Sequence, residues 1–162
     1  MLDIIFGLPT HALVVHAVVV LLPLAAAGAV LVALVPRLRG AYGWLVVAAA
    51  AVAAASVPVA THSGQHLYNR LTPGFGPRQA REAALLENHR TLAHQLWPWS
   101  VLLLVGILAV MVLHRRSASW AKPAGYVAIA LTLVGAVASG IMVARIGHAG
   151  SAALWNGVVS AK

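Results

Sequence analysis

The stretch ALVVHAVVVLLPLAAAGAVLVALV, residues Ala12–Val35, carries no charged residue over 24 positions. A helix needs about 20 consecutive apolar residues to cross the hydrocarbon core of a bilayer. Three further apolar runs follow it, Tyr42–Ala60, Leu96–Leu113 and Pro123–Ala144. Of the 162 residues, 61% are hydrophobic and 9% charged, whereas soluble domains carry about 25% charged residues. We therefore predict an all-α integral membrane protein, a four-transmembrane-helix bundle forming a single domain over residues 1–162.

The net charge of +8 is explained by the connections between the apolar runs. The first short loop holds Arg37 and Arg39, and the last holds Arg115, Arg116 and Lys122. Basic residues in short loops mark the cytoplasmic side of a membrane protein. Both termini should then face outward, in a multi-pass protein of the bacterial inner membrane. The lipid bilayer is the expected partner, and nucleic acid is not.

Most of the histidines fall at the predicted outer end of the spans. The seven are His11, His16, His62, His66, His89, His94 and His148. Imidazole is the commonest metal ligand in proteins, and ionisable groups at membrane depth are by default functional candidates. His114, at the opposite end, is expected to be a solvated loop residue.

A pattern recurs in the two halves of the chain: H-x4-H, two spans joined by a basic loop, H-x-G, and then Leu-aromatic-Asn. Corresponding histidines open and close each copy: His11, His16 and His62 in the first, and His89, His94 and His148 in the second. The pattern predicts a duplicated helical hairpin with a pseudo-two-fold axis along the membrane normal. Hairpin 1 covers residues 1–70, an outer connection covers 71–90, and hairpin 2 covers 89–162. A different register, pairing His16 with His89, is the alternative.

The connection Pro77–Gln95 is expected to be helical. Proline suits a first helical turn, and Arg78 and Glu82 have the i, i+4 spacing of a helical ion pair. This helix would either extend the third span or lie along the membrane surface.

Ligand chemistry narrows what the histidines could hold. Hard cations prefer carboxylates, and no Asp or Glu lies within a span. The chain has no cysteine, which leaves haem b with two axial histidines, or zinc or copper bound by imidazole alone. Haem b fits best, with His16 and either His94 or His89 as axial ligands.

The remaining candidates have supporting roles. His11, His62 and His148 would be hydrogen-bonding neighbours of the ligands or ligands of a second site, and Arg70, Arg90 and Arg145 would face the haem propionates. A zinc or copper site would instead draw on His16, His94, His89, His62 and His66.

These residues favour a small cytochrome b-like membrane protein that transfers electrons at the extracytoplasmic face. Its partners would be a quinone and an outer redox carrier. The alternatives are a non-haem zinc- or copper-binding or transport protein and a structural subunit of a membrane complex. A homodimer is a further alternative for the state of assembly. Because no nucleophile–base pair, carboxylate pair or phosphate loop is present, an electron carrier or subunit is expected rather than a stand-alone enzyme.

The segment Gly7-Leu-Pro-Thr-His-Ala-Leu-Val-Val-His16 resembles the opening of a bacterial membrane family, domain of unknown function 2231. That family typically begins Leu-Pro-x-His-Pro-x-x-Val-His-Phe-Pro and continues with four apolar spans. Ala12 stands here in place of the first Pro after His, and Ala17-Val18 in place of Phe-Pro. The segments that begin at His89 and at Gly147 are also similar. The resemblance implies a four-span protein of unassigned activity, and fusions of some members to cytochrome c or Rieske-type domains imply redox chemistry at the outer face.

Overall fold

The computed structural model describes residues 4–5, 7–76 and 79–159. Two short strands, β1 (Ile4–Ile5) and β2 (Leu8–Pro9), pair antiparallel ahead of the first helix. The helical elements are α1 (Thr10–Leu34), α2 (Leu38–Leu71), the 3-10 turn η1 (Thr72–Gly74), α3 (Ala80–His94), α4 (Leu96–Leu113) and α5 (Ala121–Val159). The last three predicted apolar runs fall entirely inside helices, and α1 ends at Leu34, one residue before the end of the first run.

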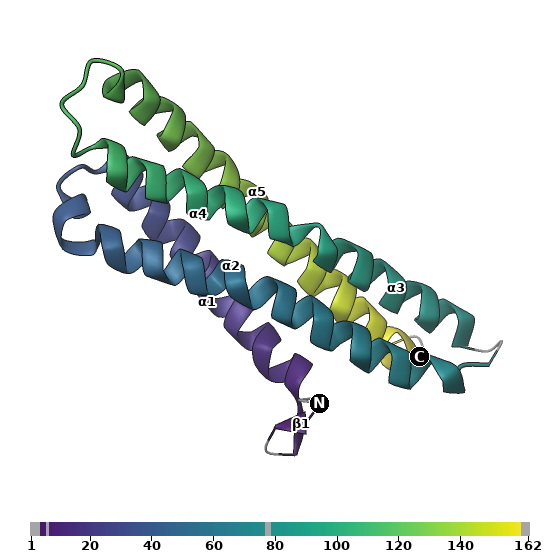
Figure 1. Cartoon of the computed structure of the whole chain (residues 1–162). Helices are drawn as coiled ribbons and strands as arrows, with labels where there is room; N and C mark the ends of the chain where they lie inside the picture. The colour runs from purple at the N-terminus through teal and green to yellow at the C-terminus, as the bar shows by residue number, and fades with distance from the viewer. Residues whose placement is uncertain (1–3, 6, 77–78, 160–162) are drawn as a thin grey trace.

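Four helical segments in the described chain are long and apolar enough to cross a membrane. One of them is the continuous segment Ala80–Leu113, in which only Gln95 separates α3 from α4. The predicted helical connection therefore extends the third span, as Figure 1 shows, rather than lying across the surface. Its first two expected residues, Pro77 and Arg78, lie outside the described residues.

The helices form a bundle of two hairpins. α1 packs along α2, and α4 packs along α5, while α1 also contacts α5 and α2 contacts α4. α1 and α4 therefore lie diagonally across the bundle. The start of α1 and the end of α5 lie at one end, with α3 (Figure 1), which we call the histidine end. The α1–α2 and α4–α5 turns lie at the other, the basic end, named for Arg37, Arg39, Arg115, Arg116 and Lys122.

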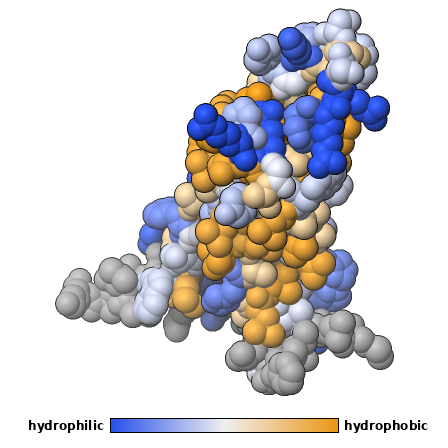
Figure 2. All heavy atoms as spheres, turned by 90° about the vertical axis from the view of Figure 1, so that its left-hand side faces the viewer, coloured by the Kyte–Doolittle hydropathy of each residue, from blue (hydrophilic) through white to orange (hydrophobic). Residues whose placement is uncertain are grey.

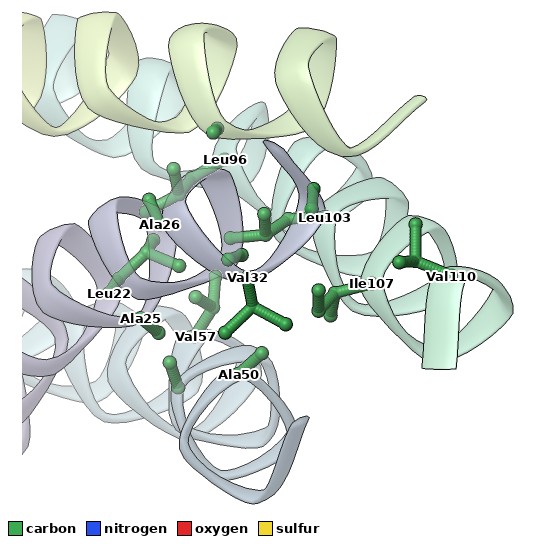
Figure 3. Packing of buried hydrophobic residues seen from close by; sticks show 14 of the residues in the cluster. Leu22, Ala25, Ala26, Val32, Ala50, Val57, Leu96, Leu103, Ile107 and Val110 are labelled. Atoms are coloured by element: carbon green, nitrogen blue, oxygen red, sulfur yellow. The ribbon is translucent and has the colours of Figure 1, made fainter. Parts of the chain in front are cut away.

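The core is apolar and built largely from small side chains. Figure 3 shows residues of α1, α2 and α4 pointing toward one another, among them Leu22, Val57 and Leu103. These three side chains are at most 1% exposed. Large apolar side chains also cover the outside, with Leu24 64% and Leu45 67% exposed. An apolar exterior around an apolar core suits a bundle whose solvent is lipid.

Glycines bring α4 and α5 into backbone contact. A Cβ atom added at Gly106 would lie 2.7 Å from the backbone nitrogen of Thr132, and one at Gly135 would lie 2.6 Å from that of Leu103. Real Cβ atoms do not approach backbone atoms this closely. Small residues of this kind permit the close packing that holds helices together in lipid.

Candidate histidine site

Two histidines from opposite halves of the chain are each tied to the neighbouring helix of their own hairpin. Nδ1 of His11, on α1, lies 3.0 Å from the carbonyl oxygen of Ala60 on α2. Nδ1 of His89, on α3, lies 3.0 Å from the carbonyl oxygen of Ile146 on α5. Each accepting carbonyl belongs to the residue two positions before the histidine of an H-x-G motif. Both imidazoles are half-buried.

The glycine of each H-x-G motif makes room for the facing ring. A Cβ at Gly64 would lie 2.9 Å from Cε1 of His11, and a Cβ at Gly150 would lie 3.1 Å from Nδ1 of His89. Because glycine has no side chain, each imidazole lies directly against the helix backbone. The motif thus supplies both the hydrogen-bond acceptor and the space for one histidine in each hairpin.

These hydrogen bonds fix the tautomer of both rings. A carbonyl oxygen only accepts, so Nδ1 must carry the proton and donate it. In a neutral imidazole the other nitrogen, Nε2, then keeps its lone pair for a ligand. Histidines that ligate metals usually have their second nitrogen held in this way. In both His11 and His89 the backbone hydrogen bond therefore leaves Nε2 as the nitrogen with a lone pair.

Both rings border the same two small cavities. One cavity, of about 80 Å³, lies between α2 and α3 and is also lined by Tyr68, Arg90 and His94. The other, of about 60 Å³, has walls from α1, α2, α4 and α5. Ala60, Thr61 and Ala93 line both cavities as well. The two histidines are consequently brought together across the bundle, at its histidine end.

The other predicted histidines lie at the surface. His16 is exposed, and its Nδ1 donates to the Ala12 carbonyl on its own helix. The exposed rings of His62 and His66 meet edge to face with centroids 4.7 Å apart, as their i, i+4 spacing predicts. His94 is exposed at the rim of the 80 Å³ cavity, and His148 is exposed on α5. His114, at the basic end, is also exposed, and its Nδ1 donates to the Met111 carbonyl.

The structure thus brings together His11 and His89, the first of the pairs that the repeat predicts. It does not bring together the preferred axial pair, since His16 lines neither cavity that His89 borders. Across the described part of the chain, no group of three or more His, Cys, Asp or Glu residues could hold a metal ion.

One arginine reaches the candidate site. Arg90 donates to both carboxylate oxygens of Glu87 and to the amide oxygen of Gln65 on α2. Its guanidinium also lies 5.3 Å from the centre of the Tyr68 ring. The other two predicted arginines, Arg70 and Arg145, are exposed. Arg90 therefore links α3 to α2 beside the cavity, and its charge is already balanced by a carboxylate.

Sequence reasoning missed the groups that hold the imidazoles. The Ala60 and Ile146 carbonyls were not candidates, because an apolar residue's carbonyl leaves no mark in a sequence, and the cross-helix partner Gln65 was not a candidate either. The available signal was the glycine of each H-x-G motif, four residues after the accepting carbonyl.

Four apolar helices around an apolar core in which alanine is the commonest residue define a multi-pass membrane protein in contact with lipid. A family model described as "Predicted membrane protein (DUF2231)" matches residues 7–162, and the chain belongs to that family. This agrees with the resemblance carried by its opening segment. No curated protein and no solved structure matches the chain.

Proposed function

We propose that this membrane protein is an electron carrier that binds haem b through Nε2 of His11 and His89. The proposal rests on one observation: two half-buried imidazoles from diagonal helical segments, each with Nδ1 held by a carbonyl, border the same cavities. Haem b with two axial histidines needs one available imidazole nitrogen on each face. The donor set fits that requirement.

The space around the rings sets a condition on binding. The cavities measure about 80 and 60 Å³, whereas pockets for drug-sized ligands measure about 300 Å³ or more. A macrocycle therefore requires the helices beside the histidines to separate. The contact between α2 and α3 suits this movement for two reasons. Small residues, Ala60, Gly64 and Ala93, line it, and Arg90, which joins its two sides, is half-exposed.

The residues around the cavities orient the two imidazole rings and place a cation at the edge of the site. The Ala60 and Ile146 carbonyls hold the two rings and raise the basicity of Nε2. Arg90 at the cavity edge offers a guanidinium to carboxylate groups, in exchange for its present partner Glu87. When bound, haem supplies a one-electron couple whose potential depends on its axial ligands.

A second candidate is a zinc or copper ion at the same two imidazoles, and the cavity volume favours it. A water molecule takes up about 30 Å³ in the liquid, so about 80 Å³ admits an ion with a few waters. Imidazole suits both metals. Because no third protein ligand lies within the described residues, water or a bound molecule would complete the coordination.

The test is a visible spectrum and a metal analysis of the detergent-purified protein. A reducible Soret band lost in both His11→Ala and His89→Ala, but kept in His16→Ala and His62→Ala, supports the haem proposal. The two controls remove exposed imidazoles from the same end of the bundle. Loss of the band in His16→Ala, with retention in His11→Ala, would instead support the axial pair expected from the sequence. Stoichiometric zinc or copper without a Soret band supports the second candidate, and neither signal rejects both.

A further inference from the structure

A further hollow lies at the basic end, away from the histidine pair. Its volume is about 550 Å³, and it lies where the end of α1, the α1–α2 turn, the end of α4 and the start of α5 meet. Leu34, Leu113 and Ile129 contribute apolar wall. The polar lining comes from Arg39, Arg116, Lys122 and His114.

No acidic residue stands near these basic residues in the sequence. Among the described residues the acidic ones are Glu82 and Glu87, and both lie on α3 at the histidine end. Arg39 donates to the carbonyls of Val32 and Ala33, at 3.2 and 2.7 Å, and so holds the last turn of α1 beside the hollow.

Two cations on the hollow remain available to a ligand. The side chains of Arg116 and Lys122 are exposed and make no hydrogen bond or ion pair with any residue that the structure describes. Figure 2 looks onto the basic end and shows hydrophilic side chains gathered above and beside apolar ones. The described residues supply no anion that balances these two charges.

We infer that this hollow binds the phosphate headgroup of an anionic membrane lipid. Basic pockets between transmembrane helices take such headgroups. The apolar walls continue into the apolar spans, so a ligand here has room for hydrocarbon below its charge. Tyr126, on the lining, and the nearby Trp120 are 74% and 59% exposed, as expected for aromatic residues at a membrane–water interface. This inference is independent of the histidine site.

The competing explanation is that these charges only orient the chain in the membrane. The structure separates the two explanations. Arg37 lies in the α1–α2 turn and Arg115 in the α4–α5 turn, both at the basic end, but neither residue lines the hollow. A double substitution of Arg37 and Arg115 removes as much charge from the basic end as one of Arg116 and Lys122. Only the second pair borders the hollow.

The experiment compares lipid binding by the wild type, Arg116→Gln/Lys122→Gln and Arg37→Gln/Arg115→Gln. Native mass spectrometry of delipidated protein titrated with phosphatidylglycerol, and separately with phosphatidylcholine, gives the affinities. We expect the wild type to prefer phosphatidylglycerol. Each lining charge removed should weaken that binding on the order of fivefold, and the control pair should change it less than twofold.

Three results would overturn the inference. They are equal losses in the two double variants, no preference between the two lipids, and inorganic phosphate binding the wild type as tightly as phosphatidylglycerol. The last result would identify free phosphate as the ligand. A circular dichroism spectrum unchanged between the variants, with matching thermal unfolding, ensures that lost binding does not reflect misfolding.

Discussion

In hairpin 1, a Cβ on Gly28 of α1 would lie 3.1 Å from a methyl group of Val46, a side-chain contact. In hairpin 2, Cβ atoms on Gly106 and Gly135 would meet the backbone of the partner helix at 2.7 and 2.6 Å. The two hairpins therefore differ in how their spans pack.

At the histidine end the hairpins agree. Each holds one imidazole with a carbonyl 3.0 Å from Nδ1, and each leaves room for the ring with a glycine four residues further on. Since the spans below are packed differently, helix packing alone does not produce this match. The geometry that the two hairpins share is confined to the histidines and their contacts. This match is what the proposal of one ligand bound by both rings expects.

The packing difference gives the largest expected effect. Gly135→Ala should lower the free energy of unfolding by about 1–3 kcal/mol, because the backbones of α5 and α4 must separate to admit a methyl group. Gly28→Ala should cost less than Gly135→Ala, since only the Val46 side chain must shift. Unfolding in detergent followed by circular dichroism measures both. Gly140→Ala is the matched control on α5, where a Cβ meets nothing within 4 Å. Equal losses at Gly28 and Gly135 would remove the distinction between the hairpins.

The second prediction concerns the match at the histidine end. Gly64→Ala should weaken the binding of haem b added to purified protein about 10–100-fold, because groups that orient ligating histidines typically have effects of that size. Gly150→Ala should have a smaller effect, since its Cβ would be 3.1 Å from the ring rather than 2.9 Å.

Spectroscopic titration gives both affinities. Gly147→Ala, one turn before Gly150 and with nothing within 4 Å of its Cβ, should bind haem like the wild type. If neither Gly64→Ala nor Gly150→Ala changes the affinity, the two rings do not act as ligands.

The smallest expected effect comes from a feature that only one hairpin has. The position after His89 is Arg90, whereas the position after His11 is Ala12. Arg90→Gln should leave the midpoint of thermal unfolding within the scatter of repeat measurements, because its ion pair with Glu87 is half-exposed and therefore screened by water. A large drop in that midpoint would show that Arg90 holds α3 against α2, and that the hairpins differ in stability at this end too.

The sequence predicted the four spans, the bundle and the family correctly, since runs of about 20 apolar residues have few alternatives. It also paired His11 with His89, through the spacing of the repeated motifs. The choice of His16 as a preferred ligand had a weaker basis. α1 is apolar on nearly every side, so no polar stripe indicates which face meets the bundle. Five residues separate His11 from His16, about 140° around a helix, and only His11 proves to face α2.

The hollow at the basic end was not predicted for a related reason. Arg39, Arg116 and Lys122 come from three separate elements, and charge counting alone assigns them to topology. Their neighbours Arg37 and Arg115 carry the same charge and stand at most two residues away from Arg39 and Arg116 in the sequence. Only the arrangement of the helix ends separates the residues that border a cavity from those that do not.

The lengths of the helices determine how far the histidine pair stands from the middle of the membrane. With 34 and 39 residues, α2 and α5 are about 51 and 58 Å long at 1.5 Å per residue, against a hydrocarbon thickness of about 30 Å. Ala60 follows the start of α2 by 22 residues, about 33 Å along its axis. With the basic turns fixed at one water boundary, the remainder of the bundle rises past the opposite one as a short stalk. The His11–His89 pair therefore lies near the base of that stalk, close to water rather than in the middle of the hydrocarbon.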